Sequence, residues 1–173
     1  MGKIKAHLPV KLVCAVTVSD VSLWEKVRSE LQKIFGELDH LLNWYDFHHT
    51  DYYRAEMGSN LKKRMLSFAK LISAERLVEI KLTTNGLEKK FLEKSRRKVN
   101  LDPGYISASK LVLATTKDYS HRLYLGKGIF GDLHLSFRHH HFSPNSWTYP
   151  DYREPFVIQF FEHVQETYMR QLG

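Results

Sequence analysis

The C-terminal third of the chain contains runs of alternating apolar and polar residues that are separated by very short turns. The three runs are Lys110 to Lys117, His121 to Leu125 and Ile129 to Phe137, joined by Asp118-Tyr119-Ser120 and by Gly126-Lys127-Gly128. Such alternation is typical of β-strands, and turns this short join antiparallel neighbours. This part of the chain therefore predicts an antiparallel meander.

The length of the second turn decides which side chains share a face of that meander. A three-residue loop gives the pairs Leu125–Ile129, Leu123–Gly131 and Arg122–Asp132. A two-residue loop instead places Leu123 opposite Asp132, so the three-residue loop is preferred. In that register the residues predicted to face the core are Leu123, Leu125, Ile129, Leu133, Leu135 and Phe137. The predicted polar face contains Arg122, Tyr124, Asp132, His134 and Ser136, with Thr115 and Lys117 if the preceding hairpin closes tightly.

The first seventy residues predict strands around one helix. Lys11 to Ser19 is rich in Val and has no helical period, which indicates a buried strand. Trp24 to Phe35 carries its apolar residues on one helical face and is followed by Gly36, a common helix-terminating residue. Two further strands are predicted over Leu38 to Phe47 and over Leu61 to Ala69.

Two interpretations compete for Ala74 to Glu93. A helix places Leu77, Ile80, Leu87 and Phe91 on one stripe. Leu77 to Thr84 also alternates, as a strand does, but the helix is favoured. The choice matters because a strand would give Glu79-Ile80-Lys81 the acidic-x-Lys pattern of restriction-type metal-dependent nucleases, with Asp46 or Asp51 as the upstream acid.

The order of elements predicts one α+β domain over residues 1–173. Asp102-Pro103-Gly104 is predicted to be a turn, and Asp151 with Glu154 is a predicted N-cap for a last helix. We expect a mostly antiparallel sheet with about three helices packed on one face. Its front half would be ferredoxin-like, β-α-β-β-α-β, followed by the β-meander and the C-terminal helix.

The positive charge is concentrated in one segment. The whole chain carries a formal charge of +7, whereas Leu61 to Asn100 alone has twelve Lys and Arg residues against four Asp and Glu residues, a net charge of +8. Basic patches attract nucleic acid, phosphate groups or anionic membranes. A solvated helix face is the structural alternative for such a charge run.

The polar face of the meander and the basic segment supply candidate functional residues. The candidates for binding a phosphate-bearing ligand are Lys117, His121, Arg122, Tyr124, Arg96 and Arg97. The candidates for acid/base catalysis are Asp102, Asp132 and His134. A simple cross-strand ion pair between Arg122 and Asp132 is the structural alternative.

A carboxylate-rich and aromatic stretch supplies the candidate metal ligands. These are Asp46, Asp51 and Glu56, because carboxylates are the ligands that a divalent cation prefers. Adjacent histidines such as His48 and His49 point to opposite faces of a strand and cannot act there as two ligands of one metal.

Several motifs and classes are excluded. The sequence lacks G-x-x-x-x-G-K-[ST], G-x-G-x-x-G, H-E-x-x-H and G-x-S-x-G. The single cysteine, Cys14, excludes an internal disulfide framework and a multi-cysteine zinc site. Leu8 to Val18 is too short and too interrupted to span a bilayer. We therefore expect a cytoplasmic protein without membrane insertion.

Several stretches together carry a family resemblance. They are Asp46 to Gly58, Asn100 to Tyr105, Lys110 to Lys117, His121 to Leu125 and Trp147 to Tyr152. In residue types and spacing these stretches resemble the prokaryotic family catalogued as domain of unknown function 4416, over nearly the whole chain. The resemblance implies no established reaction, cofactor or catalytic residue.

Three functions from different classes follow. The first is a protein that binds a nucleotide or RNA through the basic segment and the hairpin residues Lys117, His121 and Arg122. The second is a metal-dependent phosphoester hydrolase that draws on the Asp, Glu and His residues and requires a divalent cation. The third is an interaction module whose basic segment meets an acidic protein partner.

Overall fold

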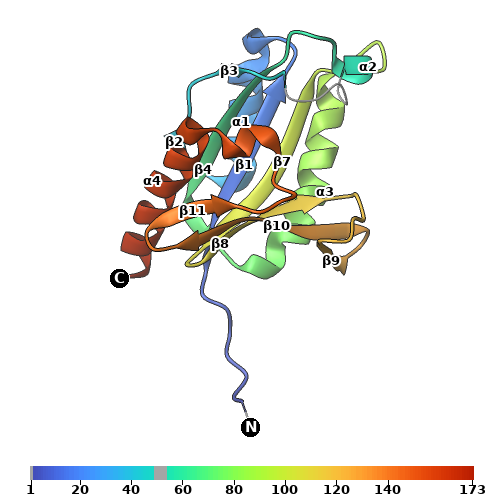
Figure 1. The fold of residues 1–173 in the computed structure, drawn as a ribbon. Helices are drawn as coiled ribbons and strands as arrows, with labels where there is room; N and C mark the ends of the chain where they lie inside the picture. The colour runs from blue at the N-terminus through green and yellow to red at the C-terminus, as the bar shows by residue number, and fades with distance from the viewer. Residues whose placement is uncertain (1, 49–53) are drawn as a thin grey trace.

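The computed structural model describes residues 2–48 and 54–173, and a nine-stranded sheet with all its pairs antiparallel dominates it (Figure 1). Its strands are β1 (Val10–Val18), β2 (Leu38–Leu41), β3 (Tyr45–Asp46), β4 (Lys62–Ile72), β7 (Val99–Ser107), β8 (Lys110–Thr115), β9 (Arg122–Gly126), β10 (Ile129–Arg138) and β11 (His141–Pro144). A separate hairpin consists of β5 (Leu92–Glu93) and β6 (Arg96–Arg97). The α-helices are α1 (Trp24–Phe35), α2 (Arg54–Met57), α3 (Leu77–Glu88) and α4 (Pro155–Leu172), and 3-10 turns cover Val21–Leu23, Ala74–Arg76, Lys89–Phe91 and Pro150–Arg153.

The strand order confirms the predicted front half. Along the chain β1, α1, β2, β4, α3 and β7 follow one another, and in the sheet the order is β7-β1-β4-β2. This is the ferredoxin-like arrangement, with β1 in the centre. Beyond β7 the sheet continues through β8 and β10, and both β9 and β11 pair with β10. The predicted pairing of Lys110 to Lys117 with His121 to Leu125 is wrong, because β8 and β9 each pair with β10 and not with each other. The α+β class and the C-terminal helix are confirmed.

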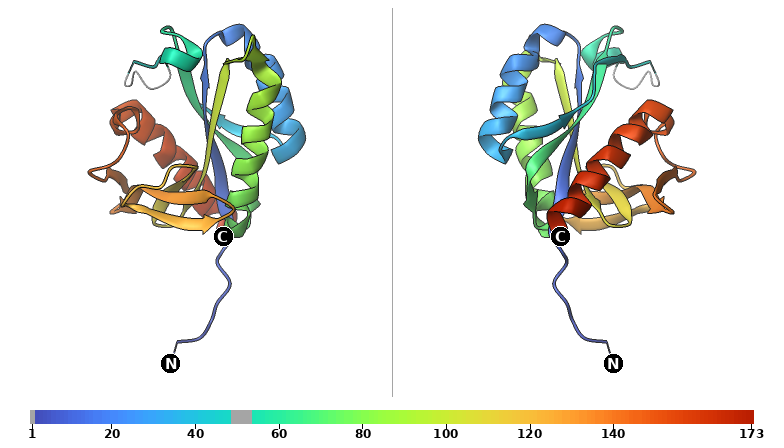
Figure 2. Two further views of the ribbon diagram at one scale, coloured as in Figure 1. Left: turned by 90° about the vertical axis from the view of Figure 1, so that its right-hand side faces the viewer. Right: turned by 90° about the vertical axis from the view of Figure 1, so that its left-hand side faces the viewer.

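The helices cover both faces of the sheet, so the expectation of one covered face is wrong. The two side views in Figure 2 show α1 and α3 on one side of the sheet and α4 on the other. The reason lies in β1, whose nine residues are all buried. Its Leu12, Cys14 and Val16 pack in the core under α1 and α3, whereas Val13 and Ala15 pack under α4. A strand buried on both faces requires cover on both.

The segment with two competing interpretations is a helix. Leu77, Ile80 and Leu87 are buried in α3, as the helical stripe predicts. The nuclease-like interpretation of Glu79-Ile80-Lys81 is therefore wrong, because it required a strand. Glu79 instead lies at the surface, where it pairs with Lys127. No helix in residues 2–48 and 54–173 is long and apolar enough to cross a membrane.

Three local predictions are wrong for identifiable reasons. The predicted strand over Leu38 to Phe47 is divided into β2 and β3. Asp102-Pro103-Gly104 lies inside β7 and not in a turn. Asp151 does not cap α4, whose N-cap is Glu154. Asp151 is instead buried, in an ion pair of 2.6 Å with Lys63.

The β9–β10 hairpin reaches the predicted register by a different turn. Arg122 pairs with Asp132 and Leu123 with Gly131, as predicted. The predicted pair of Leu125 with Ile129 is wrong, because Ile129 pairs with Gly126 and the register then shifts by one residue. The turn thus has two residues, Lys127 and Gly128, both with positive φ, followed by a bulge that restores the register.

The predicted exposure of the two hairpin faces is largely reversed. Leu123 is 75% exposed and Leu133 is 37% exposed, whereas Arg122, Asp132 and His134 are buried. A second register shift, between Leu133 and Leu135 against β8, lets Leu135 enter the core. The polar face is then covered by residues 145–153, which follow β11 and lie outside the hairpin, so alternation within the hairpin cannot reveal this cover.

Gly104 provides a test of the contact between β7 and β8. A Cβ at this position would clash with the Val112 carbonyl oxygen and lie 2.7 Å from a Leu113 methyl carbon. We expect Gly104→Ala to lower the free energy of unfolding by about 1–3 kcal/mol, as overpacked sites do. Gly86 of α3 has open space around it, so Gly86→Ala should raise stability by about 0.5–1 kcal/mol. Urea unfolding of both variants measures the contrast, and equal effects would contradict it.

Candidate functional site

The sheet opens between β7 and β8, and this opening forms a cleft. The two strands pair only between Gly104–Ser107 and Lys110–Leu113. Before Gly104, β7 pairs with β1 alone, and beyond Leu113, β8 pairs with β10 alone. The space between them, here called the β7–β8 cleft, has a volume of about 340 Å³. Its polar lining residues are Lys81, Asn85, Glu88, Lys89, Arg97, Asn100, Asp102, Thr115, Thr116, Lys117, Asp132 and Tyr149.

Asp102 is the acidic group on the β7 side of the cleft. Its carboxylate accepts hydrogen bonds from the Lys81 amine at 3.3 Å and from the Asn100 amide at 2.7 Å. The same amine also donates to the Leu101 carbonyl oxygen at 2.9 Å. Burial raises the pKa of Asp102, but the charge of Lys81 and these hydrogen bonds outweigh burial and lower it overall. Asp102 is therefore held as a carboxylate.

Glu88 of α3 and Arg97 of β6 form a second pair of charged side chains at the cleft. Glu88 accepts a hydrogen bond from the Leu101 backbone N–H at 2.7 Å, and burial raises the pKa of its carboxyl group. The Arg97 guanidinium donates to the Asn100 side-chain oxygen at 2.9 Å and to Glu56 at 2.6 Å, and it lies 3.4 Å from Glu88. Arg97 is thus fixed at the edge of the cleft.

Asp132 is the acidic group on the β10 side of the cleft. One carboxylate oxygen accepts from the Arg122 Nε at 3.0 Å and lies 3.4 Å from the His121 Nε2, and the other is 3.2 Å from the His134 Nδ1. Burial raises the pKa of Asp132, but the hydrogen bonds and charges of His134 and Arg122 lower it overall. A buried carboxylate is thereby kept ionised beside the cleft.

His134 is a fully buried, neutral histidine with a defined tautomer. Its Nε2 accepts a hydrogen bond from the backbone N–H of Tyr149 at 3.1 Å, so the ring proton resides on Nδ1 and is donated to Asp132. Burial lowers the pKa of His134, which agrees with a neutral ring. His134 has no exposed surface, and both of its ring nitrogens are occupied, by Asp132 and by the backbone of Tyr149.

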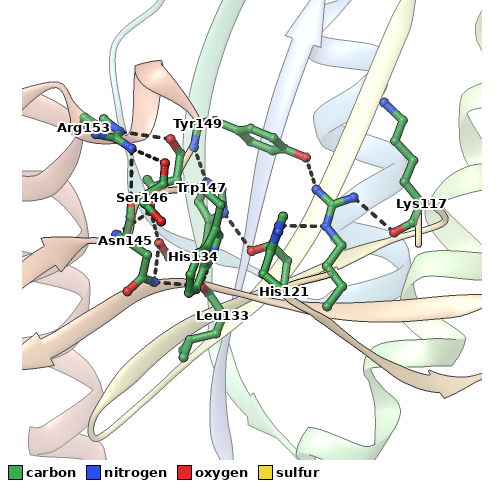
Figure 3. A network of polar contacts seen from close by, with 12 residues as sticks. Lys117, His121, Leu133, His134, Asn145, Ser146, Trp147, Tyr149 and Arg153 are labelled. Carbon is green, nitrogen blue, oxygen red and sulfur yellow. Dashed lines mark hydrogen bonds and ion pairs between the residues drawn. The ribbon is translucent and has the colours of Figure 1, made fainter. Parts of the chain in front are cut away.

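Arg122 is also buried and uses each of its nitrogen atoms internally. Besides Asp132, it donates to the Lys117 carbonyl oxygen at 3.1 Å and to the Tyr149 hydroxyl at 2.7 Å. Figure 3 shows the Tyr149 hydroxyl and the Lys117 carbonyl directed toward the same guanidinium. Arg122 therefore holds the Lys117 carbonyl and the Tyr149 hydroxyl at the cleft, and its predicted contact with phosphate stays a prediction.

The segment that covers this network is tied down by its own hydrogen bonds. The Trp147 indole donates to the Leu133 carbonyl oxygen at 2.8 Å, and Thr148 donates to the His134 carbonyl oxygen. Arg153 donates to three backbone carbonyls of residues 145–148, as Figure 3 shows. The Trp147 ring also stacks on His121 with 5.0 Å between ring centroids. The position of Tyr149 is thus fixed from both sides.

The predicted site residues divide into those at the cleft and those elsewhere. Asp102, Asp132, Lys117 and Arg97 line it, and His121, Arg122 and His134 contact Asp132. Tyr124 is exposed and packs on Phe130 outside the cleft lining. Arg96 lies on the neighbouring β5–β6 hairpin.

The predicted metal ligands do not come together within the described residues. Asp46 pairs with Lys62 at 2.6 Å, and Glu56 pairs with Arg97. Asp51 lies outside the described residues. In residues 2–48 and 54–173 there is no group of three or more His, Cys, Asp or Glu side chains that could hold a metal ion.

The basic segment Leu61 to Asn100 is divided between the interior and the surface. Lys63, Arg64 and Lys81 are buried, and Arg64 lies over two tryptophan rings. Lys81, Lys89 and Arg97 border the cleft. Arg96, Arg97 and Lys98 border a neighbouring hollow that is also lined by residues 56–60. The positive charges of this segment are therefore divided between buried side chains and side chains that line the cavities.

Sequence reasoning did not select most of the polar lining residues as ligand-binding candidates, among them Lys81, Asn85, Lys89 and Tyr149. Lys81, Asn85 and Lys89 lie four residues apart along α3 and its continuation, so they share one helical face. That spacing was the available signal. Tyr149 belongs to the Trp147 to Tyr152 stretch that carried the family resemblance, but its position depends on contacts with β10 that no local pattern reveals.

The fold and the cleft define an α+β protein of ferredoxin-like type whose extended sheet opens beside β7. The chain belongs to the family described as Domain of unknown function (DUF4416), whose model matches residues 8–168. Searches of curated proteins and of solved structures found no match. The family expected from the sequence is thereby confirmed.

The buried His134 gives the protein a defined pH dependence. An ordinary histidine has a pKa of about 6.5, and burial lowers that of His134 in the folded state, so the unfolded chain binds the proton first as the pH falls. From this residue the free energy of unfolding should fall below about pH 6.5, by at most about 1.4 kcal/mol per pH unit. The stability advantage of wild type over His134→Gln should therefore shrink between pH 7 and pH 5 in urea unfolding. His7→Gln, at an exposed site, should follow wild type, and a constant advantage over His134→Gln would contradict the argument.

The Arg122–Asp132 pair provides a second test. Arg122→Met leaves a buried carboxylate without its guanidinium, and we expect a loss of about 3–5 kcal/mol in the free energy of unfolding. Adding Asp132→Asn should recover part of that loss. Lys127→Met removes a fully surface-exposed ion pair with Glu79 and should cost less than about 1 kcal/mol. Chemical denaturation measures all three, and similar losses for Arg122→Met and Lys127→Met would refute a positioning role.

Proposed function

We propose that the β7–β8 cleft binds a phosphate-bearing ligand, specifically a nucleotide. The observation that carries the proposal is the convergence of cations from separate elements on one cleft. Lys81 comes from α3, Lys89 from the turn after it, Arg97 from β6 and Lys117 from the end of β8. Lysine and arginine at a concave site are the groups that recognise phosphate.

The acids of the cleft leave part of this positive charge available. Asp102 is balanced by Lys81 and Asp132 by Arg122. Burial raises the pKa of Glu88, and its carboxylate faces Arg97 at 3.4 Å. Within the described part of the chain, no residue forms a hydrogen bond or ion pair with the exposed amine of Lys89. Lys89 is therefore the group that we assign to the first contact with a phosphate.

The size and the remaining polar groups suit a nucleotide. A volume of about 340 Å³ lies within the range of small-molecule sites. Asn85, Thr115 and Thr116 also line the cleft, and their amide and hydroxyl groups can donate and accept hydrogen bonds with a sugar or a base. Tyr149, fixed by Arg122, adds a ring at the same place.

A metal-dependent phosphoester hydrolase is the second candidate, and one observation favours it. Asp102 and Asp132 border the same cleft from two different strands. For a divalent cation to bind there, Asp102 would exchange its contact with Lys81 for the metal. Such a cation would supply charge stabilisation for a phosphoryl group, so this candidate differs from simple binding by its requirement for metal.

Titration calorimetry with AMP, ADP and ATP tests the binding proposal. We expect saturable binding to wild type that weakens between 50 and 300 mM salt, because charge pairs between ligand and cleft are screened. Lys89→Ala and Lys117→Ala should each weaken binding about tenfold, the loss of about 1.4 kcal/mol of charge-assisted contact. Lys26→Ala, an exposed lysine of α1, is the matched control and should bind as wild type.

The outcomes separate the two candidates. Absence of saturable binding by all three nucleotides, or an equal effect of Lys26→Ala and Lys89→Ala, would contradict the proposal. Phosphate release from the same nucleotides that appears only with Mg²⁺ or Mn²⁺ and disappears in Asp102→Asn would favour the hydrolase. Asp132→Asn is less informative there, because Asp132 also holds Arg122.

A further inference from the structure

A second hollow lies beside the β7–β8 cleft, and Arg97 borders both. The second hollow has a volume of about 430 Å³ and is lined by Arg96, Arg97 and Lys98 on one side and by residues 56–60 on another. Its remaining lining is polar, from Ser19 and Asp20. Among the described residues, Arg97 is thus the one common to the linings of the two hollows.

The position of Arg97 between the two hollows is fixed by the structure around it. Asn100, Glu88 and Glu56 hold the guanidinium. The hairpin that carries it is itself held, because the Ser19 backbone N–H donates to the Lys98 carbonyl oxygen at 3.1 Å. Arg97 is therefore a fixed charge between two hollows.

We infer that the natural ligand is a single-stranded oligonucleotide, with one nucleotide in the β7–β8 cleft, the next in the second hollow and the linking phosphate at Arg97. The inference rests on the proposed function of the cleft and names its ligand class. A mononucleotide fills one hollow and leaves Arg96 unused. A strand places its repeated phosphates along the cations from Lys89 through Arg97 to Arg96, as proteins that bind single strands do, beside Lys98 in its 3.0 Å pair with Glu93.

Arg96 is suited to the second nucleotide. Its side chain is exposed on β6, and no hydrogen bond or ion pair joins it to another described residue. A planar guanidinium in this position can stack on a base, a contact that tolerates every base. Recognition would then depend on the length of the strand more than on its sequence, because phosphate contacts carry no sequence information.

The carboxylate of Glu56 competes with the linking phosphate for Arg97. The Glu56–Arg97 pair is 2.6 Å long, and the Glu56 side chain is 52% exposed. An exposed ion pair contributes little to stability and is readily exchanged. The strand would displace Glu56 when it binds, so removing the negative charge of Glu56 should favour a strand over a mononucleotide.

The test compares 5′-AMP with the 5′-phosphorylated diadenosine ribonucleotide by titration calorimetry. Wild type should bind the dinucleotide at least about tenfold more tightly, the effect of one further stacked base and phosphate. Arg96→Ala should remove most of that gain and leave the affinity for AMP unchanged. Lys89→Ala should weaken both ligands, and Glu56→Gln should strengthen the dinucleotide selectively. Melting temperatures confirm that the exposed substitutions leave the fold intact, with Lys26→Ala as the matched loss of charge.

The results distinguish this inference from the proposed function. Equal affinities of wild type for AMP and the dinucleotide would overturn the inference and leave nucleotide binding in the cleft standing. Equal weakening of both ligands by Arg96→Ala would also overturn it, because Arg96 would then act on the first nucleotide. Absence of binding by either ligand would contradict the proposed function itself.

Discussion

The separation of β7 from β8 at Gly104 is the constraint on which the site depends. Gly104 packs so closely against Val112 and Leu113 that a side chain has no room, and Pro103 has no N–H to offer a further partner. Pairing between the strands therefore starts at Gly104 and does not extend back to Asp102. A fully paired sheet would leave no cleft, and the Asp102 side chain would have no opening to line.

Buried ion pairs hold the walls of that opening in place. The pairs Lys63–Asp151 and Lys81–Asp102 join elements that are separated in the chain, and Arg122–Asp132 joins the two strands of the β9–β10 hairpin. Desolvation offsets much of the attraction within such pairs, so their contribution to stability is small compared with the cost of removing one partner. We infer that these ion pairs serve mainly to fix the positions of the side chains and strands that they join. Through Asp132, Arg122 and Tyr149, the last α-helix and its preceding turn are connected to the cleft.

The sequence predicts elements well where a local pattern decides them. The Val-rich run of β1 indicates a buried strand, and the stripe of Leu77, Ile80 and Leu87 favours a helix over the competing alternation. The ferredoxin-like order follows from these two assignments and from the neighbouring strands. The faces of the hairpin could not be predicted, because register shifts at the start and in the middle of β10 and cover by residues 145–153 decide them. Neither the shift against β8 nor this cover can be read from the hairpin sequence alone. Asp102-Pro103-Gly104 shows the same limit: its residue types predict a turn, but it lies inside β7 where the pairing with β8 ends.

The candidate site shows why individual residues were predicted more easily than their roles. Asp102, Asp132, Lys117 and Arg97 were chosen for different chemistries, yet they line one cleft. Arg122 was chosen for ligand binding and His134 for acid/base catalysis, and the structure shows both buried and in contact with Asp132. Exposure is the property that decides which of these groups a ligand meets first, and it depends on packing that no local pattern reveals. The exposed Lys89, which no motif singled out, is for the same reason the side chain of the cleft best placed to meet an anion first.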